Sequence, residues 1–113
     1  MEDKNVLNTM EIKFILSDRW KQPVDSIKDC ENITIRFENF THNKVEKLEI
    51  VVAGVTFEIE ADLYPDKFLE FELLTKIENN WYTTYNKVQV PNNINIIARD
   101  RKTFYYQTKL NLM

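Results

Sequence analysis

Cysteine, histidine and glycine each occur once among the 113 residues, and each scarcity excludes a class of protein. One cysteine forms no internal disulfide, so no part of the chain requires an oxidising compartment. One glycine excludes a phosphate-binding loop built from several glycines at fixed spacing. No apolar run approaches the ~20 residues of a membrane span, and residues 1–5 lack the apolar region of a secretory signal. We therefore expect a protein made in the cytoplasm, with no membrane partner.

Nucleophilic catalysis needs a serine or cysteine, a histidine and an orienting acid. The chain offers Cys30, His42, Ser17 and Ser26 for the first two roles. A Cys30–His42 pair requires two loops to meet, and no flanking motif supports it. We therefore expect no enzyme activity, no catalytic residue, no cofactor and no metal site, with Cys30 as a partly buried, inert thiol.

Asparagine, lysine and isoleucine are abundant where glycine, alanine and arginine are scarce. The chain has twelve Asn, eleven Lys and eleven Ile, against three Ala and four Arg. Codons for the abundant residues are rich in A and T, which indicates an A+T-rich source genome. Because Asn and Asp adopt positive φ more readily than most residues with a side chain, we expect them in the turns.

Length and composition are those of one globular domain. Hydrophobic residues make up 43% of the chain and charged residues 29%, values that argue against wholesale disorder. The polar, aperiodic residues 1–9 predict a flexible N-terminal arm, and residues 10–113 predict a single domain. The net charge of −3 disfavours nucleic acid as a partner.

Apolar and polar residues alternate with a period of two along most of the chain, which is typical of half-buried β-strands. Helical spacing appears only weakly, over residues 20–31. The alternation predicts about eight short strands, at residues 10–16, 33–38, 48–52, 55–60, 69–77, 81–90, 94–98 and 104–112. Strands at this spacing predict an all-β fold, an antiparallel two-layer β-sandwich that is immunoglobulin-like or jelly-roll-like. The residues expected to point inward are Ile12, Phe14, Ile33, Ile35, Phe37, Leu48, Ile50, Val52, Val55, Phe57, Ile59, Leu69, Phe71, Leu73 and Ile96.

Two strand connections can be inferred from side-chain phase and charge. A two-residue turn at Ala53 and Gly54 places the apolar residues of both flanking strands on one face, whereas a bulge at Gly54 places them on opposite faces.

If the strands on either side of residues 62–66 were neighbours, Glu58 would face Glu70, and like charges opposite each other destabilise a sheet. We therefore expect the chain to cross to the second sheet there. The alternative is calcium bound among Glu58, Glu60, Asp62 and Asp66.

Basic and aromatic side chains offer two kinds of binding surface. Residues 99–106 combine both, as single-strand nucleic acid binders do, but Asp100 and the acidic net charge disfavour that role. Trp20, in a charged loop, is the aromatic residue most expected at the surface, and Tyr64 lies in another loop. Exposed Trp and Tyr would suit a carbohydrate-binding module.

The ends of the chain offer a loose arm and a strand edge. The arm, residues 1–9, lacks periodic apolar residues, and the strand 103–112 stays apolar up to Leu110 and Leu112. Small sandwiches add to other protein chains through such features. We therefore expect the arm or the last strand to dock onto another chain.

These features predict a non-enzymatic binding or assembly domain that acts through strand edges and loops. Its partners would be other protein chains, either further copies or components of a particle. The composition suggests a structural component of a phage or virus particle, capsid- or tail-associated, incorporated in a virion. A carbohydrate-binding module is one alternative, and an inhibitor or immunity-type protein is another. The candidate interaction residues are Trp20, Tyr64, Arg99, Arg101, Lys102, Leu110 and Leu112.

Overall fold

The structure, a computed structural model, describes residues 9–102 and 104–113. No part of this described chain forms a helix long and apolar enough to cross a membrane. One short 3-10 turn, η1 (Ile27–Asp29), accompanies the strands. The strands are β1 (Met10–Ser17), β2 (Asn32–Asn39), β3 (Val45–Val52), β4 (Val55–Leu63), β5 (Phe68–Ile77), β6 (Asn80–Thr83), β7 (Gln89–Val90), β8 (Asn93–Arg99) and β9 (Tyr105–Asn111).

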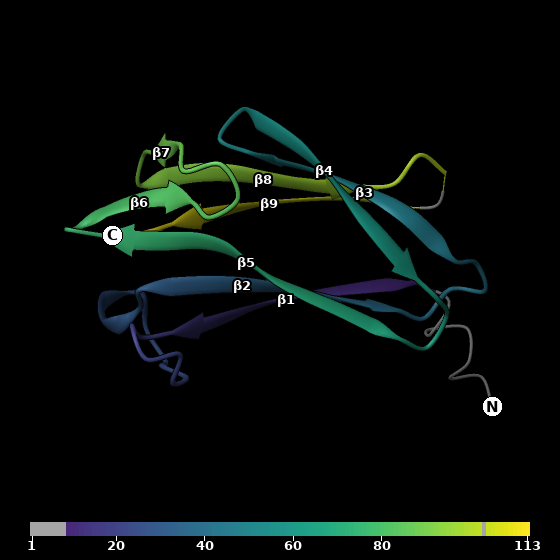
Figure 1. The fold of residues 1–113 in the computed structure, drawn as a ribbon, viewed down its shortest axis with the longest axis horizontal. Coiled ribbons are helices and arrows are strands. Elements are labelled where there is room, and N and C mark those ends of the chain that lie inside the picture. The colour runs from purple at the N-terminus through teal and green to yellow at the C-terminus, as the bar shows by residue number, and fades with distance from the viewer. Residues whose placement is uncertain (1–8, 103) are drawn as a thin grey trace.

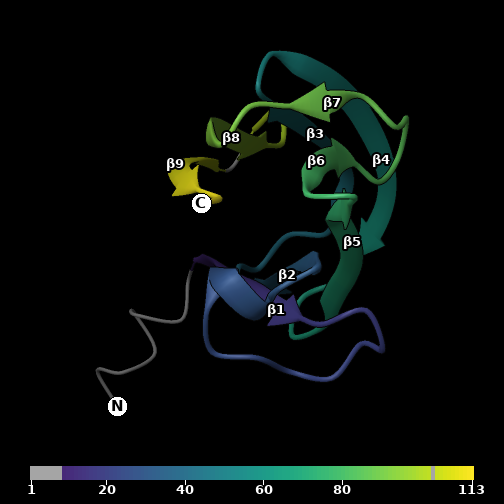
Figure 2. The ribbon, with the colours of Figure 1, turned by 90° about the vertical axis from the view of Figure 1, so that its left-hand side faces the viewer.

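Two antiparallel sheets pack against each other (Figures 1 and 2). In the described residues, one sheet has five strands in the order β1-β2-β5-β6-β7, and the other has four in the order β4-β3-β8-β9. The predicted all-β, two-layer sandwich is confirmed. Strands that are consecutive in the chain pair as β1–β2, β3–β4, β5–β6, β6–β7 and β8–β9.

The β3–β4 hairpin has the register that the alternation predicts. Val52 pairs with Val55, the two residues that flank the turn. The backbone φ is +50° at Ala53 and +84° at Gly54, so both turn residues have the left-handed conformation of a type I′ turn. The single glycine therefore makes a hairpin turn, and the bulge alternative is wrong.

β4 and β5 belong to different sheets, as the expected repulsion between Glu58 and Glu70 requires. Glu70 instead pairs with Arg36 of the neighbouring strand, at 2.7 Å. Glu58 lies opposite Glu49, whose carboxylate binds Arg99 at 2.6 Å. Arg36 thus offsets Glu70, and Arg99 offsets Glu49, the acid opposite Glu58. The facing pair of Glu58 and Glu70, on which the calcium alternative depended, does not form.

The turns use asparagine and aspartate, but other residues as well. Asp66 and Asn79 have the expected positive φ in turns, and Asp62 has it within β4, where the β3–β4 register shifts. The prediction is incomplete, because the same conformation occurs at Lys21, Ala53, Glu78 and Lys87. With one glycine in the chain, these turns retain a strain of about 1–2 kcal/mol per residue.

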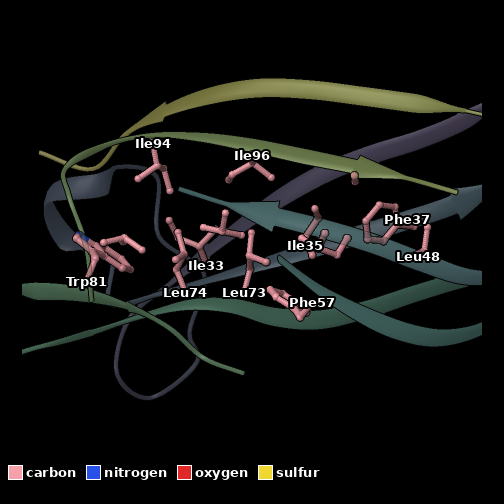
Figure 3. Packing of buried hydrophobic residues seen from close by; sticks show 14 of the residues in the cluster. Ile33, Ile35, Phe37, Leu48, Phe57, Leu73, Leu74, Trp81, Ile94 and Ile96 are labelled. Carbon is pink, nitrogen blue, oxygen red and sulfur yellow. The ribbon is translucent and has the colours of Figure 1, made fainter. Parts of the chain in front are cut away.

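The core lies between the sheets and is filled by alternate residues of the central strands (Figure 3). Predicted core residues on β2, β3 and β8 are buried. The half-buried members of the predicted set are Ile12, Phe14, Val55, Ile59, Leu69 and Phe71. Most of them lie on β1 and β4, which are edge strands with a neighbour on one side. Buried apolar residues outside the predicted set are Cys30, Val45, Leu63, Leu74, Trp81, Val90, Ile94, Ala98 and Leu112.

The predicted strand over residues 81–90 is wrong, because the chain turns in its middle. At the end of β6, the Thr83 hydroxyl donates to Asn86 Oδ1 at 2.6 Å. This bond helps to close a turn that leads into the short β7. Tyr85 therefore leaves the strand alternation and stacks on Phe57 of the other sheet, with ring centroids 5.0 Å apart.

Candidate functional site

The candidate interaction residues divide between the two ends of a molecule that measures 47 × 27 × 21 Å. Trp20 lies in a loop that is hydrogen-bonded to Asn32, at the start of β2. Tyr64 lies in the β4–β5 loop, which is hydrogen-bonded to Asn39 at the end of β2. The β8–β9 turn lies at the Tyr64 end and the C-terminus at the Trp20 end (Figure 1). Trp20 and Tyr64 therefore cannot stack on the same sugar ring.

Each of these exposed aromatic residues already has a cation near its ring. Trp20 is 70% exposed, with Arg19 Cζ 5.2 Å from its ring centroid. Tyr64 is 51% exposed, with Lys44 Nζ at 4.6 Å. Lys44 also binds Asp62 at 2.6 Å, and this carboxylate raises the pKa of the lysine. A ligand that stacked on this face of Tyr64 would have to displace a paired cation.

The predicted basic cluster lies around a concave region of about 860 Å³. Arg99 is bound by Glu49, whose carboxylate raises the pKa of the arginine. Arg101 and Lys102 are exposed, and the Lys102 N–H donates to Asp100 Oδ1 at 3.0 Å. Acids share the lining with the bases: Glu46, Glu49, Glu58 and Asp100. The region is thus a mixed-charge hairpin tip and differs from the basic groove of a nucleic acid binder.

Cys30 and His42 are too far apart to form a catalytic pair. They lie beyond opposite ends of β2, whose eight residues span about 25 Å. Cys30 has no exposed surface, and its thiol donates to the Asn32 carbonyl at 3.1 Å. Burial raises the pKa of this thiol, so the thiolate is disfavoured in the folded protein.

We expect the Cys30 thiol to be unreactive in the folded protein. Because it is buried and protonated, a disulfide reagent such as dithiobis(nitrobenzoate) at pH 8 should react only as fast as the protein unfolds. The rate of thiol release, measured with and without urea, checks this. Fast modification in buffer would contradict it. Cys30→Ser retains a hydrogen-bond donor for Asn32 and should leave partner binding unchanged.

Strand edges are a further kind of candidate, because free edges pair with other chains unless charge, shortness or a covering segment blocks them. In the described part of the chain, β1 and β7 are the edges of one sheet, and β4 and β9 those of the other. β1 is covered at one end, where the Val24 N–H donates to the Leu16 carbonyl at 3.1 Å. β7 has two residues. β4 exposes the acids Glu58, Glu60 and Asp62.

Among the edge strands of the described residues, β9 has the least of these protections along its seven residues. Its one charged side chain is Lys109. The Leu112 N–H donates to the Asn92 carbonyl at 2.6 Å, which makes these two residues a hydrogen-bonded pair. In the β8–β9 register, every second residue before Leu112 therefore directs its backbone N–H and C=O groups toward β8. The residues between them direct their backbone N–H and C=O groups away from β8. β9 lies at the margin of its sheet (Figure 2), so these groups point outward. These residues are Tyr105, Gln107, Lys109 and Asn111.

The side chains near the C-terminus require one correction. Leu112 is 4% exposed and belongs to the core, so it does not face a partner as predicted. Together with Ile27 and Trp81, it lines a shallow hollow at this end of the sandwich. Tyr106 and Leu110 are half-buried and pack on the core from the inner face of β9.

The predicted N-terminal arm falls almost wholly outside the described residues. The exception is Thr9, whose carbonyl accepts a hydrogen bond from the Phe40 N–H at 2.8 Å. Thr9 thus extends the β1–β2 pairing and belongs to the domain. Docking of residues 1–8 stays a prediction.

In the described chain, no group of three or more His, Cys, Asp or Glu side chains is placed to hold a metal ion. The outward-facing groups of β9 have a defined physical capacity, which is to pair with another strand. No protein-family model, curated protein or solved structure matches this chain.

Proposed function

We propose that the chain is a non-enzymatic binding or assembly domain that joins another protein chain through the free edge of β9. The observation that carries this proposal is a seven-residue edge strand with outward-facing backbone groups and a single charge. A strand added there satisfies these groups with main-chain hydrogen bonds. On composition, the proposal extends to a structural component of a phage or virus particle, capsid- or tail-associated.

The alternative functions differ from the proposed one in the surface that binds or in the partner that is bound. A carbohydrate-binding module needs aromatic residues on one platform, and Trp20 and Tyr64 lie at opposite ends of the domain. An inhibitor or immunity-type protein also binds a protein chain, but its partner is a single target protein. The decisive experiment therefore has to identify the chain that lies at the β9 edge.

Gln107→Pro should abolish binding at this edge and leave the fold intact. Proline lacks an N–H, and the Gln107 N–H faces away from β8, so no bond of the β8–β9 ladder is lost. A photoreactive amino acid in place of Tyr105, which is exposed on the same strand, cross-links the partner in a native extract. We expect a defined protein adduct that disappears when Gln107→Pro is added.

Thr56→Pro is the matched control on the other edge of the same sheet. Val55 pairs with Val52 beside the turn, so the N–H of the next residue, Thr56, faces away from β3. This variant should leave the adduct unchanged. Mass spectrometry of the adduct distinguishes a second copy, a particle component and a single target protein. The proposal fails if the adduct persists with Gln107→Pro, or if none forms with all native components present.

A further inference from the structure

We propose that the chain at the β9 edge is a second copy of this protein, paired antiparallel about a two-fold axis through Thr108. The inference rests on the proposed use of this edge and adds its partner and register. A two-fold axis makes an interface self-complementary, so each residue has to suit the residue opposite it. The sequence of β9, YYQTKLN, can therefore be compared with each register.

Three registers keep most of β9 paired, with the axis at Gln107, Thr108 or Lys109. With the axis at Lys109, two lysines face each other, which destabilises a strand pair, and the first two residues of β9 extend beyond the partner strand. With the axis at Gln107, the last two residues extend beyond it. With the axis at Thr108, all seven residues pair, and the outward-facing groups exchange about eight hydrogen bonds.

The Thr108 register also matches the side chains on both faces of the strand. On the inner face, Tyr106 lies opposite Leu110 of the second copy, which extends the half-buried apolar surface that packs on the core. Thr108 lies opposite its own copy, a favourable cross-strand pair. On the outer face, Gln107 lies opposite Lys109 of the second copy, so each charge meets a neutral amide.

Pairing through β9 uses the same edge of both copies and therefore joins only two chains. The two four-stranded sheets join into one continuous sheet that has β4 at both outer ends. β4 exposes Glu58, Glu60 and Asp62, and acids facing acids oppose the addition of further strands. The product along this sheet is therefore a dimer and not a fibre.

Two substitutions at Gln107 test the register with opposite signs. Sedimentation equilibrium of the full chain over a concentration series gives the dimer dissociation constant. Gln107→Glu places a carboxylate opposite Lys109 twice per dimer and should tighten the dimer about two- to thirtyfold. Gln107→Lys places lysine opposite lysine and should weaken it by a similar factor. Because the chain has a net charge of −3, overall repulsion between two copies would rise with Gln107→Glu and fall with Gln107→Lys. Overall charge therefore predicts the opposite order of dimer affinities and cannot produce this result.

Cysteine substitution locates the axis directly. Thr108→Cys places two thiols opposite each other in a non-hydrogen-bonded pair, with Cα atoms about 4.5 Å apart, which is within disulfide range. Mild oxidation should therefore give a covalent dimer. Lys109→Cys is the matched control and should cross-link poorly, because it faces Gln107. The native Cys30 has no exposed surface and does not compete.

The inference is overturned by a chain that stays monomeric, by equal effects of the two Gln107 substitutions, or by better cross-linking at Lys109 than at Thr108. The proposed function fails separately. A monomeric chain whose Tyr105 adduct contains a different protein and disappears with Gln107→Pro overturns the self-pairing and keeps the edge function. Absence of both dimer and adduct overturns both.

Discussion

Phe37→Ala is expected to lower the free energy of unfolding by roughly 3–5 kcal/mol. Phe37 has no exposed surface and stacks on Phe71, with ring centroids 6.0 Å apart. It lies on β2, between β1 and β5, so its removal leaves a cavity that three paired strands cannot easily fill. Urea unfolding, followed by the fluorescence of the buried Trp81, measures the loss.

Phe68→Ala is the matched control, because the same side chain is removed from the outer face of the same sheet. Phe68 is 56% exposed, and Arg36 Cζ lies 3.7 Å from its ring centroid. Loss of this surface contact should cost less than about 1 kcal/mol. Similar losses for the two variants would show that the inward phase of β2 is misassigned.

Asn39→Ala is expected to lower the free energy of unfolding by about 3 kcal/mol, an unusually large loss for a polar residue. The fully buried Asn39 amide Nδ2 donates to the carbonyls of Asn43 (2.9 Å) and Leu63 (3.0 Å). Its Oδ1 accepts the N–H (3.0 Å) and the hydroxyl (2.7 Å) of Thr41. Alanine removes all four hydrogen bonds and leaves the buried Leu63 carbonyl without this donor, whereas the Thr41 hydroxyl still donates to the Asn43 carbonyl at 3.1 Å. A buried group left unpaired costs about 1–3 kcal/mol, and the other lost bonds add to this.

The Asn39 side chain joins the β2–β3 loop to the end of β4, so the loss should appear as a lower urea midpoint. Asn43→Ala is the matched control, because Asn43 is exposed and contributes its backbone groups to this network. It should change stability by less than about 0.5 kcal/mol. An Asn39→Ala loss as small as the control's would mean that water replaces the amide.

The alternation of side chains determined the strands and the sandwich class, because the side of a strand on which a residue lies is a local property. The β3–β4 register followed from the same pattern and from the two-residue turn at Gly54. The separation of β4 from β5 followed from charge, since Glu58 and Glu70 could not face each other without a cation. Each of these conclusions depends on residues close in sequence or on a single repulsive pair.

Other features carried no sequence signal. The turn within residues 81–90 depends on the bond between Thr83 and Asn86, which interrupts an otherwise strand-like segment. The buried role of Asn39 is equally hidden, because one asparagine among twelve looks like a loop residue until its partners are known. Polar networks of this kind are defined by three-dimensional contacts.

The tertiary structure alone decided which features can act together. It placed Trp20 and Tyr64 at opposite ends, separated Cys30 from His42, and buried Leu112 in the core. The sequence marked the last strand by its apolar residues. That β9 has only β8 as a neighbour among the described strands, and which of its backbone groups face outward, come from the sheet order and register. The physical reason is that sheet neighbours are chosen by pairing between residues far apart in the chain, whereas alternation depends on adjacent residues.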